Sequence, residues 1–254
     1  MKFYRNDLTD SQWIIIKEVL ADKRKRQHDL RLVCNLLLYL LRTGCQWREL
    51  PDRGMGWEVV YYYFRKWEAT GVVEQLHQHL YEQSRQQKKR HIKPTAAVLD
   101  SQSVKTALAN ETVGYDAGKK VKGRKRHLLV DTQGWLLGTR VSGADETDRK
   151  GAKALLGQAD TLQLSKLEVI YADGGYRGKL QQEVKEEYGF EIIIIKKIEK
   201  GSFKVLPKRW IVERTFAWID KCRRLSKDYE RLASTSEAFI LLAMCRLMLN
   251  YIEN

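Results

Sequence analysis

The spacing of apolar residues changes near residue 93, and this change restricts the folds that the chain can adopt. Over residues 8–80 apolar side chains recur every three or four positions, as they do in amphipathic helices. Beyond Pro94 the apolar runs are short and typical of strands. The polar, basic stretch 83–93 between these two parts is typical of a hinge. We therefore predict two domains, a helical one at residues 1–92 and a second one at residues 93–254.

Three helices are expected at the start of the first domain. Thr9 and Gln12 form a potential capping box, in which each side chain satisfies a free backbone donor of the other, and this predicts where the first helix begins. The second helix, at 30–42, ends at Gly44, and the third covers 57–69. Four side chains lie outside the apolar face of the third helix: Tyr61, Tyr62, Arg65 and Lys66. A helix-turn-helix would present such a helix to DNA, and an ordinary bundle with a solvated basic face fits the spacing equally well.

The second domain is expected to be α/β. Strands are predicted at 96–104, 126–131, 136–142, 167–173 and 191–196, and helices at 149–162, 178–188, 208–224 and 236–252. This order describes a mixed five-stranded sheet flanked by helices. The first and fourth strands can lie side by side in such a sheet, which would bring residues at their ends together.

Three carboxylates are the candidates for chemistry. Asp100 and Asp173 lie in or at the end of apolar strands, where a carboxylate loses hydration unless a cation compensates it. Either residue alone would be more typical of a turn or a helix cap, but together they indicate a shared metal ion. Glu213 lies one helical turn from Arg209. That spacing fits a plain ion pair, and it also fits a third carboxylate beside a phosphate-binding guanidinium.

Other acidic and sulfur-containing residues have simpler explanations. Asp131 precedes a turn, and Asp145 and Asp148 precede a helix whose N-terminus favours negative charge. The four cysteines are widely spaced and form no CxxC pair, so neither a disulfide frame nor a structural zinc site is expected. The hard oxygen ligands of the three candidate carboxylates suit Mg²⁺, for which Mn²⁺ can substitute.

The balance of charge favours a nucleic-acid partner. The formal net charge is +14, and such an excess of cations supplies the counterion release that drives binding to polyanions. A dense basic run precedes the second predicted strand; it is either a solvated hairpin face or, as we favour, a DNA contact. The expected DNA contacts outside the first domain are Lys119, Lys120, Lys122, Arg124, Lys125, Arg126, His127, Arg177, Arg209 and Arg224. The N-terminus lacks the apolar core of a signal peptide, so a cytoplasmic protein is expected.

Several long blocks of sequence resemble one known family. The blocks VLDSQSVKT, GYDAGKKVKGRKRHLLVDTQGWLL, YADGGYRG and WIVERTFAWIDKCRRLSKDYER, in this order, are similar to the signatures of bacterial insertion-sequence DDE transposases, in the family commonly numbered five. LTDSQW and LLRTGCQWRELP also resemble the N-terminal helical segment of that family. The sequence departs from the family at residues 54–56 and 61–63, where its members tend to have proline and arginine.

The resemblance implies an RNase H-like catalytic domain whose DDE triad is Asp100, Asp173 and Glu213. It implies a DNA transposase that binds the terminal inverted repeats of an insertion sequence, cleaves at their ends and joins them to target DNA. Two Mg²⁺ ions roughly 3.5–4 Å apart would act in both steps, and a homodimer would process the two ends together. The alternatives are an RNase H-like nuclease or resolvase without strand transfer, and a domesticated DNA-binding protein.

Overall fold

The computed structural model describes residues 7–20, 27–107, 111–158, 164–195 and 208–253. The chain forms two compact units. The first consists of Met1–Arg90, Lys221–Ser226 and Ala238–Asn254, and the second of His91–Asp220 and Lys227–Glu237. The predicted boundary after residue 92 lies two residues from the division after Arg90. At the other end of the chain the division differs from the prediction, because residues 221–226 and 238–254 belong to the first unit.

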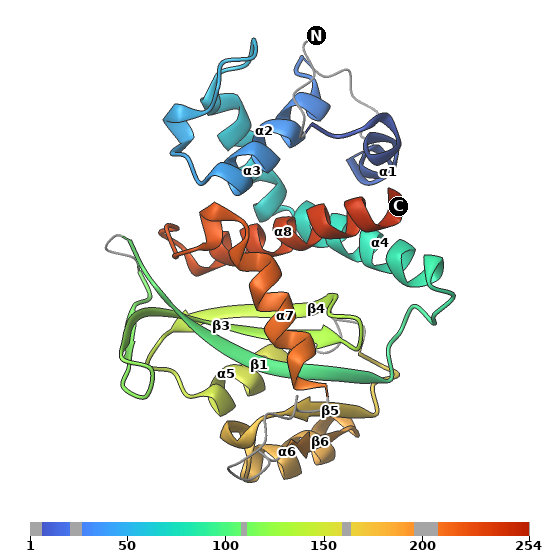
Figure 1. Ribbon diagram of the computed structural model, residues 1–254, viewed down its shortest axis with the longest axis vertical. Coiled ribbons are helices and arrows are strands. Elements are labelled where there is room, and N and C mark those ends of the chain that lie inside the picture. The colour runs from blue at the N-terminus through green and yellow to red at the C-terminus, as the bar shows by residue number, and fades with distance from the viewer. Residues whose placement is uncertain (1–6, 21–26, 108–110, 159–163, 196–207, 254) are drawn as a thin grey trace. The chain divides into compact units, whose positions relative to one another are not determined.

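The first unit is helical (Figure 1). It contains α1 (Asp10–Leu20), α2 (Leu30–Thr43), η1 (Trp47–Glu49), α3 (Trp57–Ala69), α4 (Val72–Gln87), η3 (Arg223–Leu225) and most of α8 (Ala233–Glu253). α1 packs against α4, and α2 packs against both α3 and η3. Phe64 of α3 stacks on Phe239 of α8 with 4.8 Å between the ring centroids. The C-terminal helix therefore completes the core of this unit.

The helix ends in the first unit follow local rules. The predicted capping box is present: Gln12 N donates to Thr9 Oγ1 at 3.2 Å, and Thr9 N donates to Gln12 Oε1 at 3.3 Å. Gly44 ends α2 with a φ of 68°, a backbone region in which glycine avoids the clash of a Cβ. α3 has the predicted bounds. α4 continues through Gln87, so the first part of the expected hinge is helical, and its residues Ser84 and Arg85 are buried.

α8 is apolar along most of its length. By length and composition it is the one helix within the described ranges that would suffice to cross a membrane, with a mean hydropathy of 1.3. However, 61% of that apolar window is buried inside the protein. Burial of this kind is typical of a core helix.

The second unit contains a mixed sheet in the order β2-β3-β1-β5-β6, with β4 also paired to β3. The strands are β1 (Ala96–Lys105), β2 (Gly114–Asp116), β3 (Val121–Asp131), β4 (Leu136–Gly143), β5 (Val169–Ala172) and β6 (Glu191–Ile194). β3 runs antiparallel to β1, β2 and β4, whereas β1, β5 and β6 are parallel. The predicted pairing of the first and fourth strands is confirmed, because these strands are β1 and β5. The α/β class and the flanking helices agree with an RNase H-like fold.

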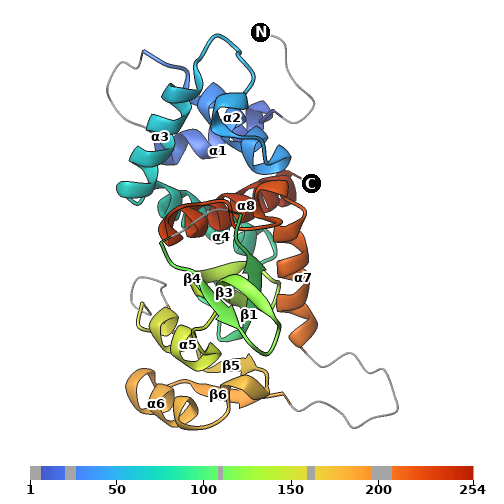
Figure 2. The same cartoon turned by 90° about the vertical axis from the view of Figure 1, so that its left-hand side faces the viewer.

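Helices cover both faces of this sheet (Figures 1 and 2). α5 (Asp148–Leu156) and α6 (Lys179–Tyr188) pack on one face, where Leu99, Leu129 and Ile170 of the sheet join Leu155 and Val184 in a buried cluster. α7 (Arg209–Asp220) contacts β1 and β3 on the other face. Successive residues of a strand point to opposite faces, so neighbours in β1 serve different helices.

Several details of the second unit differ from the prediction, among them the following. β2 was not expected, so the sheet has six strands instead of five. β3 begins at Val121, five residues before the predicted start at 126, because its lysines and arginines conceal the strand from an apolar pattern. α7 ends at Asp220, four residues before the predicted end at 224. The predicted helical residues 159–162 and the last predicted strand residue, 196, lie outside the described residues.

Candidate active site

Asp100 and Asp173 come together at the point where the parallel pairing of β1 with β5 ends. Leu99 of β1 is the register partner of Ala172 of β5. Asp100 directly follows Leu99, and Asp173 directly follows Ala172. Asp173 follows β5 and begins η2 (Gly174–Tyr176), where Gly175 N donates to its Oδ1 at 2.8 Å. The sheet topology thus joins two carboxylates that are 73 positions apart in the sequence.

The surroundings of Asp100 disfavour its charged form. Burial raises its pKa to about 6, even though the backbone N–H of Ser101 donates to Oδ1 at 2.7 Å and lowers it. The charge of Asp173 raises the pKa further, while Arg209 and Lys119 lower it. A nearby cation would favour the charged form of this carboxylate, because its positive charge replaces the hydration that burial removes.

Arg209 connects the two other candidate carboxylates. Its Nη2 lies 3.7 Å from Asp173 Oδ2, and its Nε lies 3.2 Å from Glu213 Oε1 one turn later on α7. The predicted pairing of Arg209 with Glu213 is therefore present. The carboxylate of Glu213 is 55% exposed and that of Asp173 is 29% exposed, so solvent reaches this side of the site. Asp100, Asp173 and Glu213 all lie around this one guanidinium.

The donor set fits a divalent cation in part. The aspartate pair supplies hard oxygen ligands in a desolvated setting, which suits Mg²⁺ or Mn²⁺. Among the described residues no group of three His, Cys, Asp or Glu side chains is close enough to share one ion. Arg209 instead occupies the space between Asp173 and Glu213. The two aspartates are therefore the residues of this site that could hold a divalent cation as they stand, whereas Glu213 is paired with Arg209.

Asp131 has the turn role that its sequence position indicates. Its Oδ1 accepts from Gln133 N at 2.8 Å and from Trp135 N at 3.0 Å, which closes the connection between β3 and β4. Asp145 is exposed at the end of β4. Asp148, at the start of α5, has contacts that reach toward the aspartate pair and are described below.

The basic run entering β3 divides into an exposed part and a buried part. Lys119, Lys120 and Lys122 are exposed, as is Arg177 after η2. The expectation of DNA contact is wrong for the other four residues, Arg124, Lys125, Arg126 and His127, because each is at most 6% exposed. Their side chains point into the two faces of the sheet and serve the protein interior.

Arg124 illustrates why these cations are buried. Its guanidinium donates to the carbonyl oxygens of Thr112, Glu230 and Arg231 and to Asp228 Oδ1 at 2.6–3.1 Å. It thereby fastens the segment that precedes α8 to β3. On the other face, Lys125 Nζ donates to the carbonyl of Glu146 at 2.7 Å. His127 Nε2 lies 3.0 Å from Ser142 Oγ, and burial lowers the pKa of this histidine to about 4.

Arg224 is a further correction. It lies in η3 of the first unit instead of on the helix that carries Glu213, and it is 7% exposed. Its Nη1 donates to the carbonyl of Cys45 at 2.9 Å, and its guanidinium lies over the rings of Trp47 and Phe239. Its role is thus internal packing, because α7 ends before it.

The helix α3 exposes the side chains that its periodicity predicts. Tyr61 and Tyr62 are 41% and 59% exposed, and Lys66 is also exposed. Arg65 is partly exposed and pairs with Glu68 on the same helix. The opposite side of α3, with Val60, Phe64 and Trp67, is buried.

Two residues near the aspartate pair were not singled out from the sequence. Ser101 donates its N–H to Asp100, and Tyr176 is fully buried, with a pKa raised by burial and then by Asp100, Asp148 and Asp173. The signal for Ser101 was its place directly after Asp100 in a strand. No pattern indicated Tyr176, since its surroundings arise from β1, α5 and η2 together.

The chain is similar to proteins of known families. A family described as "Transposase DDE domain" matches residues 91–248, more than half of the chain, and one described as "Putative transposase of IS4/5 family" matches residues 8–77. A "Putative transposase for insertion sequence element IS402" from Burkholderia cepacia is 30% identical over 134 residues, which is 50% of this chain and 64% of that protein. An "Insertion element IS402 uncharacterized 16.2 kDa protein" from the same organism is 28% identical over 117 residues, which is 42% of this chain and 78% of that protein.

Proposed function

The chain belongs to the transposase DDE domain family of bacterial insertion sequences, and we propose that it binds the terminal inverted repeats of its element, cleaves the DNA at their ends and joins these ends to target DNA. The matched region covers 64% of the first relative, so the activity of the whole protein is part of this proposal. One observation carries it: Asp100 and Asp173 each follow the last paired residue of β1 and β5, with Arg209 and Glu213 beside Asp173.

In the proposed reaction the three carboxylates hold Mg²⁺, and Mn²⁺ substitutes for it. The chemistry that bound divalent ions supply is activation of the attacking oxygen, a water or a 3′-hydroxyl, and stabilisation of the leaving oxygen. Asp100 and Asp173 hold the ions from the sheet, and Glu213 does so from α7. Arg209 turns its guanidinium from the carboxylates to the DNA backbone, because a guanidinium can grip phosphate oxygens in bidentate fashion.

The proposed DNA contacts are the exposed cations and aromatic residues of both units. Lys119, Lys120, Lys122 and Arg177 would contact the backbone near the triad, where phosphate contacts position the duplex. Tyr61, Tyr62, Arg65 and Lys66 of α3 would contact the terminal repeats, as a helix-turn-helix does. We further propose a homodimer in the active complex and action at the DNA of the bacterial cytoplasm.

The test uses a plasmid that carries the inverted repeats flanking the gene, incubated with the full-length protein in Mg²⁺ or Mn²⁺, followed by sequencing of cut and joined ends. The variants are Asp100→Asn, Asp173→Asn and Glu213→Gln. The control is Glu183→Gln, which removes an exposed carboxylate from α6. We expect cleavage and joining by wild type and the control, and binding without cleavage by each triad variant.

Each other outcome points to a different function. Cleavage without joining by the wild type would support a nuclease or resolvase. Binding without cleavage in either metal would support a DNA-binding protein that has lost its catalysis. Normal cleavage by any one triad variant would remove that residue from the triad.

A further inference from the structure

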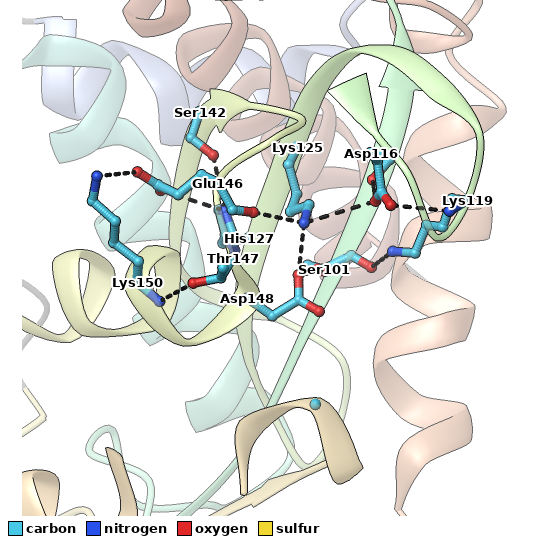
Figure 3. A network of polar contacts seen from close by, with 12 residues as sticks. Ser101, Asp116, Lys119, Lys125, His127, Ser142, Glu146, Thr147, Asp148 and Lys150 are labelled. Carbon is cyan, nitrogen blue, oxygen red and sulfur yellow. Dashed lines mark hydrogen bonds and ion pairs between the residues drawn. The ribbon is translucent and has the colours of Figure 1, made fainter. Parts of the chain in front are cut away.

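A network of charged and polar side chains lies on the α5 face of β1, behind the aspartate pair (Figure 3). Asp148 Oδ1 accepts from Ser101 Oγ at 2.7 Å and lies 3.1 Å from Lys125 Nζ. Lys125 also lies 3.7 Å from Asp116 Oδ2, and it donates to the carbonyl of Glu146. The side chain of Lys125 is 7% exposed and that of Asp148 is 29% exposed. None of these side chains belongs to the proposed catalytic triad.

Ser101 joins this network to Asp100. Its backbone N–H donates to Asp100 Oδ1, its hydroxyl donates to Asp148, and its carbonyl accepts from Lys119 Nζ at 3.3 Å. Asp100 and Ser101 are successive residues of β1, so their side chains point to opposite faces of the sheet. The position of the Ser101 hydroxyl therefore influences the position of the backbone N–H that holds the Asp100 carboxylate.

Asp148 is also close to the second aspartate. A Cβ placed on Gly175 would lie 3.1 Å from Asp173 Oδ1 and 3.3 Å from Asp148 Oδ2, so Asp148 and Asp173 flank the same glycine. The charges of Asp100, Asp148 and Asp173 all act on the buried hydroxyl of Tyr176 and raise its pKa. A side chain at Gly175 would therefore crowd both carboxylates.

A role for Asp148 as a simple helix-end residue leaves these contacts unexplained. Thr147 already caps α5, because its Oγ1 accepts from Lys150 N. The carboxylate of Asp148 turns instead to Ser101 and Lys125. Burial alone raises the pKa of Asp148, but the Ser101 hydroxyl and Lys125 more than offset this and hold the pKa below its usual value. Asp148 therefore stays ionised, and Lys125 balances its charge.

We infer that Asp148 is a positioning residue for the Asp100–Asp173 pair: held by Lys125, it fixes Ser101 and thereby orients the Asp100 carboxylate toward the cation. This inference rests on the proposed function. Partners that orient metal ligands typically contribute 10–100-fold to metal affinity or activity. Asp148 acts on the ligand from behind and does not itself bind the ion.

The experiment measures Mn²⁺ affinity by electron paramagnetic resonance on the full-length protein, together with single-turnover cleavage and a thermal melt. The variants are Asp148→Asn, Ser101→Ala, their double mutant and Ser101→Thr, which retains the hydroxyl. Glu183→Gln is the control on α6. All affinities are measured well below the melting temperature of the least stable variant, so that a purely structural role leaves them unchanged.

We expect Asp148→Asn and Ser101→Ala each to weaken Mn²⁺ binding about 10–100-fold. The double mutant should be no weaker than the weaker single mutant, because both changes break one chain of contacts. Ser101→Thr should bind within about threefold of the wild type, and the control should be unchanged.

Three outcomes would overturn the inference. Affinity of Asp148→Asn equal to that of the wild type would remove any positioning role. Loss of binding in Asp148→Asn with normal binding in Ser101→Ala would make Asp148 a direct ligand instead. Additive losses in the double mutant would separate Ser101 from Asp148. A wild-type protein that neither binds Mn²⁺ nor cleaves would overturn the proposed function itself, which distinguishes the two failures.

Discussion

Asp100 and Glu213 are both candidate metal ligands, but their surroundings differ in how they affect the stability of the folded protein. Asp100 is largely shielded from solvent in the middle of β1, and this desolvation raises its pKa to about 6. Glu213 is 55% exposed on α7 and pairs with Arg209. An acid with a raised pKa destabilises the folded state whenever it is charged, so Asp100 costs stability at neutral pH. A charge kept at a site where it lowers stability is typical of a residue needed for function.

Asp100→Asn should therefore raise the melting temperature while it abolishes cleavage. The expected gain is about 1–3 kcal/mol at pH 7.5, or several degrees. The gain should vanish as the pH falls from about 6 to 3.8, because wild-type Asp100 becomes neutral in that range. Glu213→Gln is the matched variant, expected to lose cleavage with an unchanged melting temperature. Calorimetry at several pH values checks both, and equal melting temperatures of Asp100→Asn and the wild type would contradict the account.

His127 should make the second unit sensitive to acid. Burial lowers its pKa to about 4 from a usual value of 6.5, so the unfolded chain takes up a proton first as the pH falls. Stability from the neutral ring is complete above pH 6.5 and is lost between pH 6.5 and about 4. In His127→Gln the loss between pH 7 and pH 5 should be smaller than in the wild type. Urea-dependent hydrogen exchange of β3 amides measures it, with His79→Gln of the first unit as the control.

At the scale of elements, α5 sits on β3 because one residue of the helix has no side chain. A Cβ on Gly151 would lie 2.1 Å from Cε1 of His127. Glycine in a helix usually costs about 1 kcal/mol relative to alanine. Here that cost permits the close approach of α5 to the sheet, which in turn brings Asp148 to Ser101 and the aspartate pair.

Gly151→Ala should destabilise the protein despite the higher helix propensity of alanine. The added methyl group would displace α5 or the His127 ring, and overpacking of this kind costs about 1–3 kcal/mol. The double mutant His127→Ala/Gly151→Ala should lose less than the sum of the single mutants, because the first change makes room for the second. Chemical denaturation checks this. Gly174→Ala, where a Cβ meets no atom within 4 Å, should have little effect, and additive losses would show that the two residues do not compete for space.

At the scale of the whole molecule, both units carry exposed cationic side chains, and several other cationic side chains are buried in the interior. The formal net charge of +14 is therefore no measure of the number of cationic side chains that DNA can reach. Arg124, Arg126 and Arg224 are at most 7% exposed. The binding surface has to be inferred from the exposed cations alone.

The double variant Lys120→Gln/Lys122→Gln should weaken DNA binding mainly at low salt. If both lysines contact phosphate, the slope of log K against log salt should become shallower by about 1.8, since each phosphate contact contributes roughly 0.9. Fluorescence anisotropy with a duplex of the terminal repeat at several salt concentrations measures this slope. Lys185→Gln, which removes an exposed lysine paired with Glu191 on α6, is the control. An unchanged slope in the double variant would exclude this turn from the DNA interface.

The sequence by itself determined those features that depend on local order. The α3 bounds, the Thr9–Gln12 capping box and the strand that follows the turn at Asp131 are predictable from periodicity and turn chemistry, which act over a few residues. The pairing of Asp100 with Asp173 was also predictable, since strands of a mixed sheet have few arrangements and the two residues end their apolar runs alike.

Only the tertiary structure decided which polar residues face the site and which face the core. The burial of Arg124, Arg126 and His127 depends on partners 12 to 108 residues away, and no local pattern contains those partners. The same holds for Asp148, which reaches Ser101 across 47 positions because Gly151 lets α5 approach the sheet. A charged residue in a strand is solvated or buried according to what other segments bring to it, and that is a property of the assembled fold.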